Sequence, residues 1–177
     1  MSDRFNSRLV LPATVTAWSL ESLMAGNAIA GIDTATSGTW PVANKAVFYP
    51  FVLAEPGIVT GFFLLNGATV SGNVDMGLYL PNGTRLVSAG STAQSGTSVI
   101  QIFNTTDMLL GPGLYYWALA LDNTTGTTVR VAAGGRGNGI YQQTTAFPLP
   151  SSATFAVFSG TSVTPICGVI LGPRGTV

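Results

Sequence analysis

The chain has 177 residues, of which 46% are apolar, so it holds enough material for the core of a single domain. Seven basic residues balance seven acidic ones, and this neutrality argues against a nucleic-acid-binding protein, which needs a basic surface. The chain has no histidine and one cysteine, which argues against a zinc site and against hydrolases that use histidine as their base.

Residues 1–45 are expected to form an N-terminal arm that attaches the domain to a partner. Within it, residues 17–25 have the spacing of a short helix that Gly26 would end, and residues 26–45 are expected to be a long connection. The apolar side chains of the arm show no strand alternation and need to be covered: Phe5, Leu9, Val10, Leu11, Val15, Trp18, Leu20 and Leu23. We expect Phe5 and Trp18 to be among the partner contacts.

Residues 46–177 are predicted to form an all-β domain, an antiparallel β-sandwich of the jelly-roll type. The signal is a series of short β-branched and aromatic runs separated by turn residues. The predicted strands are residues 46–53, 58–65, 74–80, 84–88, 97–103, 114–121, 127–132, 155–158 and 166–171. Pro50 lies within the first of them, which predicts an edge or a bulge at that point.

A β-hairpin over residues 74–88 is the clearest local prediction. Val74, Met76, Leu78 and Leu80 alternate with Asp75, Gly77 and Tyr79, so the four apolar residues are expected to be buried together on one face. Residues 81–83, Pro-Asn-Gly, form a tight turn signal before the chain returns. Asp75 lies on the opposite face and is expected to be solvated.

Two further segments carry strong local signals. Residues 114–121 are apolar almost throughout, which predicts a central strand buried on both faces. Residues 104–107, Asn-Thr-Thr-Asp, predict a turn between two strands. Cys167 is expected to be a small buried residue on the last strand.

We expect no enzymatic activity, and we assign no catalytic, cofactor-binding or metal-binding residues. The seven acidic residues are scattered along the chain, mostly in turns: Asp3, Glu21, Asp33, Glu55, Asp75, Asp107 and Asp122. A calcium ion could use Asn104, Asp107 and Asp122 if their loops share one end of the sandwich. The simpler interpretation is that these are turn residues.

Exposed aromatic side chains are candidates for stacking on sugar rings. The sequence offers Tyr79, Tyr115, Trp117 and Tyr141. Core packing is the more ordinary role for aromatics in sandwich strands, above all for Trp117. Tyr79 and Tyr141 are therefore the candidate ligand contacts within the domain.

Residues 66–125 resemble a known group of proteins. The similarity lies in residues 67–79 (GATVSGNVDMGLY), 81–88 (PNGTRLVS), 110–116 (LGPGLYY) and 119–124 (LALDNT). These runs are similar to small β-sandwich virion structural proteins of tailed bacteriophages. The resemblance implies a jelly-roll-like sandwich carried on a phage particle, and it implies no active-site residues.

These observations predict a bacteriophage virion structural protein, a capsid decoration or cement protein that acts by binding and assembly. Its expected partners are the major capsid protein or tail proteins and further copies of itself, for which a closed cyclic trimer is one arrangement. The first eight residues lack the apolar stretch of a signal peptide, so we expect assembly in a host cytoplasm, away from membranes. The alternative is a tail- or fibre-associated module that binds a carbohydrate for host recognition. The sequence leaves head and tail locations open.

Overall fold

The computed structural model describes residues 36–131, 139–159 and 164–172. All regular elements in this part of the chain are strands. They are β1 (Thr36–Thr39), β2 (Lys45–Leu53), β3 (Gly57–Leu65), β4 (Asn73–Tyr79), β5 (Arg85–Ser88), β6 (Thr92–Ala93), β7 (Ile100–Leu110), β8 (Gly113–Leu121), β9 (Thr127–Val131), β10 (Tyr141–Gln143), β11 (Ala156–Val157), β12 (Thr164–Pro165) and β13 (Cys167–Gly172). The expected helix over residues 17–25 lies outside the described residues.

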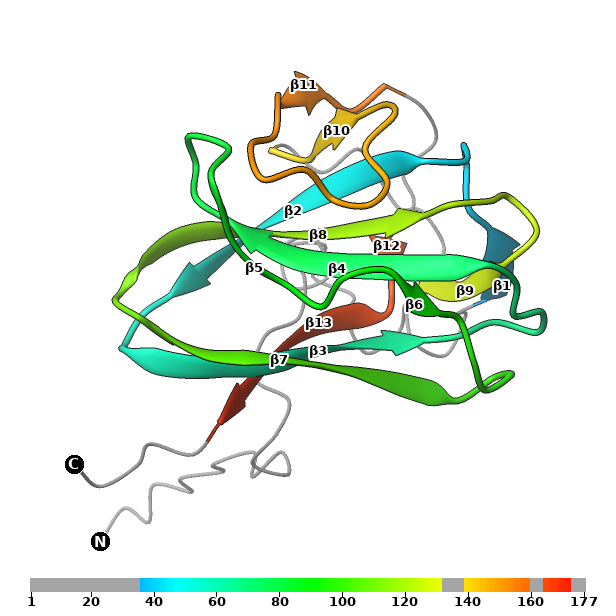
Figure 1. Cartoon of the computed structure of the whole chain (residues 1–177), viewed down its shortest axis with the longest axis horizontal. Helices are drawn as coiled ribbons and strands as arrows, with labels where there is room; N and C mark the ends of the chain where they lie inside the picture. The colour runs from blue at the N-terminus through cyan, green and yellow to red at the C-terminus, as the bar shows by residue number, and fades with distance from the viewer. Residues whose placement is uncertain (1–35, 132–138, 160–163, 173–177) are drawn as a thin grey trace, which may run out of the picture.

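The strands form three antiparallel sheets (Figure 1). The main sheet has the order β11-β10-β2-β8-β4-β5, with β6 pairing on β4. The opposing sheet has the order β13-β3-β7, and a small sheet of β1, β9 and β12 lies at one end of the molecule. The prediction of an antiparallel β-sandwich is confirmed.

The chain alternates between the two large sheets as it advances. It passes from β2 in the main sheet to β3 in the opposing sheet and back to β4, and later from β7 to β8. This crossing places β2, β8 and β4 side by side in one layer and β3 beside β7 in the other. Such alternation is the wrapping that gives a jelly roll its two layers.

The core between the sheets is built from alternate residues of the facing strands. Val74, Met76 and Leu78 of β4 are fully buried there together, as predicted. Leu80, which the alternation predicts to be buried with them, follows the end of β4 and is only half-buried against the same core. Tyr49 and Trp117 stack at the centre, with ring centroids 4.2 Å apart. Cys167 also lies in this core, so the prediction for that residue is confirmed.

The main sheet is also covered on its outer face, where the segment that carries β10 and β11 folds over it (Figure 1). Tyr116, Ala118 and Ala120 of β8 pack there against Leu149 and other apolar residues of that segment. Both faces of β8 are therefore buried, as its continuous apolarity predicts. Asp75 and Tyr79 of β4 lie under the same cover and are fully buried. The expectation of a solvated Asp75 is wrong.

The end of the expected arm belongs to the sandwich where the structure describes it. Residues 36–39 form β1 on β9, where the sequence predicts only a connection. The buried Trp40 joins the main core, and its indole N–H donates to the carbonyl of Lys45 at 2.8 Å. The expected boundary at residue 45 therefore falls inside packed structure, because one large aromatic side chain anchors the segment before it.

Two irregularities follow from proline and from turn residues. On one side of β2, Pro50 pairs with Tyr116 of β8. On the other side, β10 pairs only with residues 46–48 of β2, so at Pro50 β2 is locally an edge strand. Residues 104–107 do not form the predicted turn: β7 continues through them, and the pairing shifts so that Met108 faces Val59 while Asn104 faces Gly61. The extra residues form a bulge, because β3 pairs with β7 on both sides of them.

Leu78→Ala should lower the free energy of unfolding by about 2–5 kcal/mol, because it leaves a cavity in the packed core. Chemical denaturation measures this change. Val157→Ala is the matched control, because Val157 is 77% exposed on β11 and its truncation should cost under about 0.5 kcal/mol. Equal losses for the two variants would show that Leu78 does not lie in the core.

Candidate functional site

Exposed apolar side chains gather along β7. Val99, Ile100 and Ile102 are 51%, 56% and 50% exposed, and Leu109 at the other end of the strand is 73% exposed. We call these four residues the β7 surface. Ile100 lies opposite the half-buried Leu65 of β3. The side chains therefore extend an apolar stripe outward from the opposing sheet.

The direction of these side chains inverts the usual pattern of a sandwich strand. Ile100 and Ile102 alternate with Gln101, which would normally place the isoleucines inside and the glutamine outside. The register does the reverse: Gln101 faces the fully buried Leu64, so it shares the inner face of the sheet. The two isoleucines face outward and lose the stabilisation that burial would give them.

β7 is also an edge strand. It pairs with β3 along one side, and among the described residues no strand pairs with its other side. An unpaired edge presents N–H and C=O groups that can accept an additional strand. The bulge at residues 105–107 and the exposed Asp107 interrupt this edge, so its regular part runs from Ile100 to Asn104.

A network of side-chain amides supports the start of β7. Gln94 donates from Nε2 to Oδ1 of Asn66 at 3.0 Å and to the carbonyl of Thr127 at 2.9 Å, and its Oε1 accepts from the Ser71 N–H at 3.0 Å. Asn66 donates from Nδ2 to the Ser95 carbonyl at 2.6 Å and to Oε1 of Gln101 at 3.1 Å.

The network reaches the loop between β6 and β7 as well. Gln101 accepts from the Ser95 N–H at 2.9 Å and donates from Nε2 to the Ala93 carbonyl at 2.8 Å. Asn66 and Gln94 are both buried, so these bonds satisfy groups that water cannot reach. The amides hold the loop against β3 and β9 and thereby set the position of Val99 and Ile100. The inward direction of Gln101 has its physical reason here.

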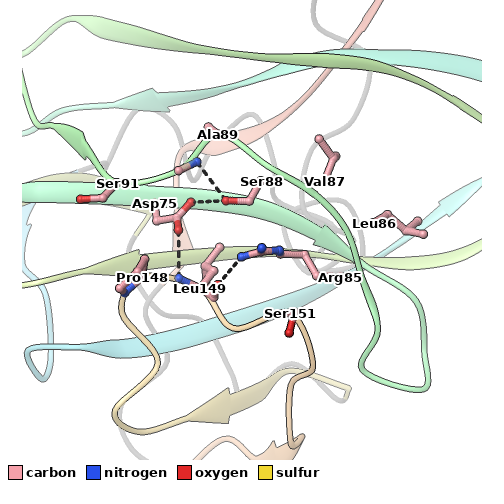
Figure 2. Close-up of a pocket in the computed structure, with 11 residues that line it drawn as sticks. Asp75, Arg85, Leu86, Val87, Ser88, Ala89, Ser91, Pro148, Leu149 and Ser151 are labelled. Atoms are coloured by element: carbon pink, nitrogen blue, oxygen red, sulfur yellow. Dashed lines mark hydrogen bonds between the residues drawn. The ribbon is translucent and has the colours of Figure 1, made fainter.

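A second polar cluster lies in an open depression on the outer face of the main sheet (Figure 2). Asp75 Oδ1 accepts from the Ser88 hydroxyl at 2.7 Å, and Oδ2 accepts from the Leu149 N–H at 2.9 Å. Ser88 Oγ in turn accepts from the Gly90 N–H at 2.9 Å, and the guanidinium of Arg85 donates to the Leu149 carbonyl. Both carboxylate oxygens of Asp75 thus accept hydrogen bonds from other groups of the protein.

Burial raises the pKa of Asp75 above its ordinary value of 3.8, against the hydrogen bonds from Ser88 and Leu149 and the charge of Arg85, which lower it. Burial also raises the pKa of the neighbouring Tyr79, whose hydroxyl donates to the Pro150 carbonyl at 2.6 Å. These groups fasten residues 149–150 to the sheet. We assign this cluster to the folding of the outer cover.

The aromatic candidates for ligand contact lie in different surroundings. Tyr79 is fully buried and has no exposed surface to offer a ligand. Tyr141 is half-buried on β10 and stacks on Phe155, with centroids 5.2 Å apart. Tyr115 and Trp117 belong to the main core. Phe5 and Trp18 lie outside the described residues.

The acidic residues considered for calcium do not meet. Asp107 lies near the β7–β8 turn, whereas Asp122 follows the far end of β8, where it accepts from the Asn73 N–H at 2.9 Å. The two acidic residues thus lie at opposite ends of β8, so the condition under which they could share a calcium ion is not met. Within the described ranges, no three His, Cys, Asp or Glu side chains gather as a metal site would require. The same part of the chain holds no helix with the length and apolarity of a membrane span.

The pH dependence of stability should carry the signature of Asp75. Because the pKa of Asp75 is raised in the folded state, the folded protein binds this proton more tightly than the unfolded chain does. The contribution of Asp75 to the free energy of unfolding is therefore largest below pH 3.8. It falls as pH rises through the folded-state pKa. The difference in unfolding free energy between the wild type and Asp75→Asn should therefore fall as pH rises. Urea denaturation over a pH series measures it, and a constant or rising difference would contradict the assignment.

Gln94→Ala should lower the free energy of unfolding by about 1–3 kcal/mol, because it leaves Asn66 Oδ1 and the Ser71 N–H without their partners in a buried setting. Gln143→Ala is the matched control, because the side chain of the half-buried Gln143 accepts from the Thr154 N–H at an exposed site. Denaturation of the two variants side by side tests the network. Equal small losses would show that the amides do not support the loop.

Comparisons of this chain with protein families, with curated proteins and with solved structures found no match.

Proposed function

We propose that this protein is a structural subunit that works by binding and assembly, and specifically a decoration or cement protein on a bacteriophage capsid. The observation that carries the proposal is the outward direction of Ile100 and Ile102 on the unpaired edge strand β7. Exposed apolar side chains beside an open strand edge are costly in a free monomer, and they become favourable when another chain covers them.

Charge adds to this argument. Only 8% of the residues are charged and the net charge is zero, so neighbouring copies repel one another weakly. A chain of this kind is poorly protected from association in free solution, whereas a subunit packed on a particle needs little such protection. The resemblance of residues 66–125 to phage virion proteins supports the particle as the place of assembly.

The alternative role as a glycan-binding module on a tail or fibre has less support. Of the two tyrosines considered for stacking in the domain, Tyr79 is buried with its hydroxyl engaged. Tyr141 remains, and its ring is already stacked on Phe155. A stacking site for sugars needs an open aromatic face, so the contacts of these residues favour assembly over glycan recognition.

The proposal is tested by locating the protein on particles and by deleting residues 1–25, which gives the arm-deleted variant. We expect many copies spread over the head, and we expect the arm-deleted variant to stay folded but to bind particles that lack the protein at least about tenfold more weakly. Electron microscopy with labelled protein, sedimentation and circular dichroism measure these outcomes. A few copies at the tail, with glycan binding, would establish the alternative. If the arm-deleted variant binds particles with full affinity, the arm has no part in assembly.

A further inference from the structure

The regular part of the β7 edge has two features that fit an extended peptide. Its outer N–H and C=O groups have no strand partner among the described residues, and its outward side chains, Ile100 and Ile102, form an apolar stripe beside them. Added strands use both features: main-chain hydrogen bonds give affinity, and alternate side chains give register. The amide network holds this edge in place before any partner arrives.

We infer that the free edge of β7 accepts residues 5–15 of a second copy of this chain as an added strand, an inference that rests on the proposed assembly function. When these residues, FNSRLVLPATV, are extended, Phe5, Leu9, Leu11 and Val15 lie at alternate positions and can face the apolar stripe together. Pro12 is compatible with the role, because an added strand becomes the new edge of the sheet and edge strands admit proline.

Charge complements this pairing. Arg8 is the only charged residue in residues 5–15, and Asp107 is the only charged residue of β7. Asp107 is exposed in the bulge that follows the regular edge. In a register that sets Arg8 just beyond Asn104, a strand laid along Ile100 to Asn104 brings the arginine near this carboxylate, which favours this partner over an acidic one.

The exchange of arms between copies rests on the proposed assembly function. The described structure begins at Thr36, and the neighbouring Ser37 accepts from the Ala68 N–H at 2.7 Å through its hydroxyl. Gly67 accepts from the Ser98 N–H at 2.9 Å, so the described chain begins close to the start of β7. Each copy carries both the arm and the acceptor edge, which suits a ring in which every copy gives one arm and receives one.

Two variants that are defective in opposite ways test the inference. The arm-deleted variant keeps the acceptor edge, and Ile100→Lys/Ile102→Lys keeps the arm but places charges on the edge. We expect the wild type to self-associate, each variant alone to be a monomer with self-association at least about tenfold weaker, and an equimolar mixture of the two to form a one-to-one heterodimer. Sedimentation velocity and native mass spectrometry measure these species. The matched control is Val157→Lys, an exposed valine on the other sheet, which should associate like the wild type.

Each other outcome has a distinct meaning. If the lysine variant associates like the wild type while the arm-deleted variant is monomeric, the arm docks elsewhere, and the inference fails while the assembly function stands. If the two monomeric variants do not combine, the edge does not accept the arm of another copy, and the inference also fails. A monomeric wild type would overturn self-assembly altogether. Circular dichroism checks folding, and Ile102→Thr replaces the lysine variant if that variant unfolds.

Discussion

The structure depends on the burial of both faces of the main sheet. β8 lies at its centre, with Trp117 and Leu119 in the core between the sheets and Tyr116 and Ala118 under the outer cover. A sheet that is apolar on both sides needs a second layer of chain on its outer face. The segment that carries β10 and β11 supplies that layer, and Asp75 fastens it by accepting the N–H of Leu149. The buried carboxylate of Asp75 thus helps to hold the cover over the apolar outer face of the sheet.

The opposing sheet differs from the main sheet in a way that bears on function. Its inner face completes the core, but along β7 its outer side chains and its edge have no cover among the described residues. Ile100 and Ile102 face outward because Gln101 is committed to the inner face by the amide network with Asn66 and Ser95. The same polar contacts that stabilise the loop therefore expose the isoleucines. Gln101 therefore links the stability of the loop to the binding that we propose for this edge.

Local pattern predicts much of the fold and little of this site. The hairpin of β4 and β5, the double burial of β8 and the place of Cys167 follow from alternation and turn residues near in sequence. The burial of Asp75 does not follow from local pattern, because Leu149 lies 74 residues away and the residues next to Asp75 do not predict that this segment packs over it. Residues 104–107 carry a genuine turn signal, yet long-range pairing with β3 turns it into a bulge. The outward direction of Ile100 and Ile102 could not be predicted either, because alternation alone assigns them to the inner face of the sheet.

Hydrogen exchange along β7 tests the central claim most directly, that this edge is where copies of the chain meet. The full-length protein is compared at a concentration where it is assembled and at one where it is dispersed, with amide exchange followed by mass spectrometry. We predict that assembly slows exchange over residues 99–104 and over residues 5–15, and that it leaves β5, the short edge strand of the main sheet, unchanged. Equal exchange of β7 in both states, with new protection on another surface, would contradict the account.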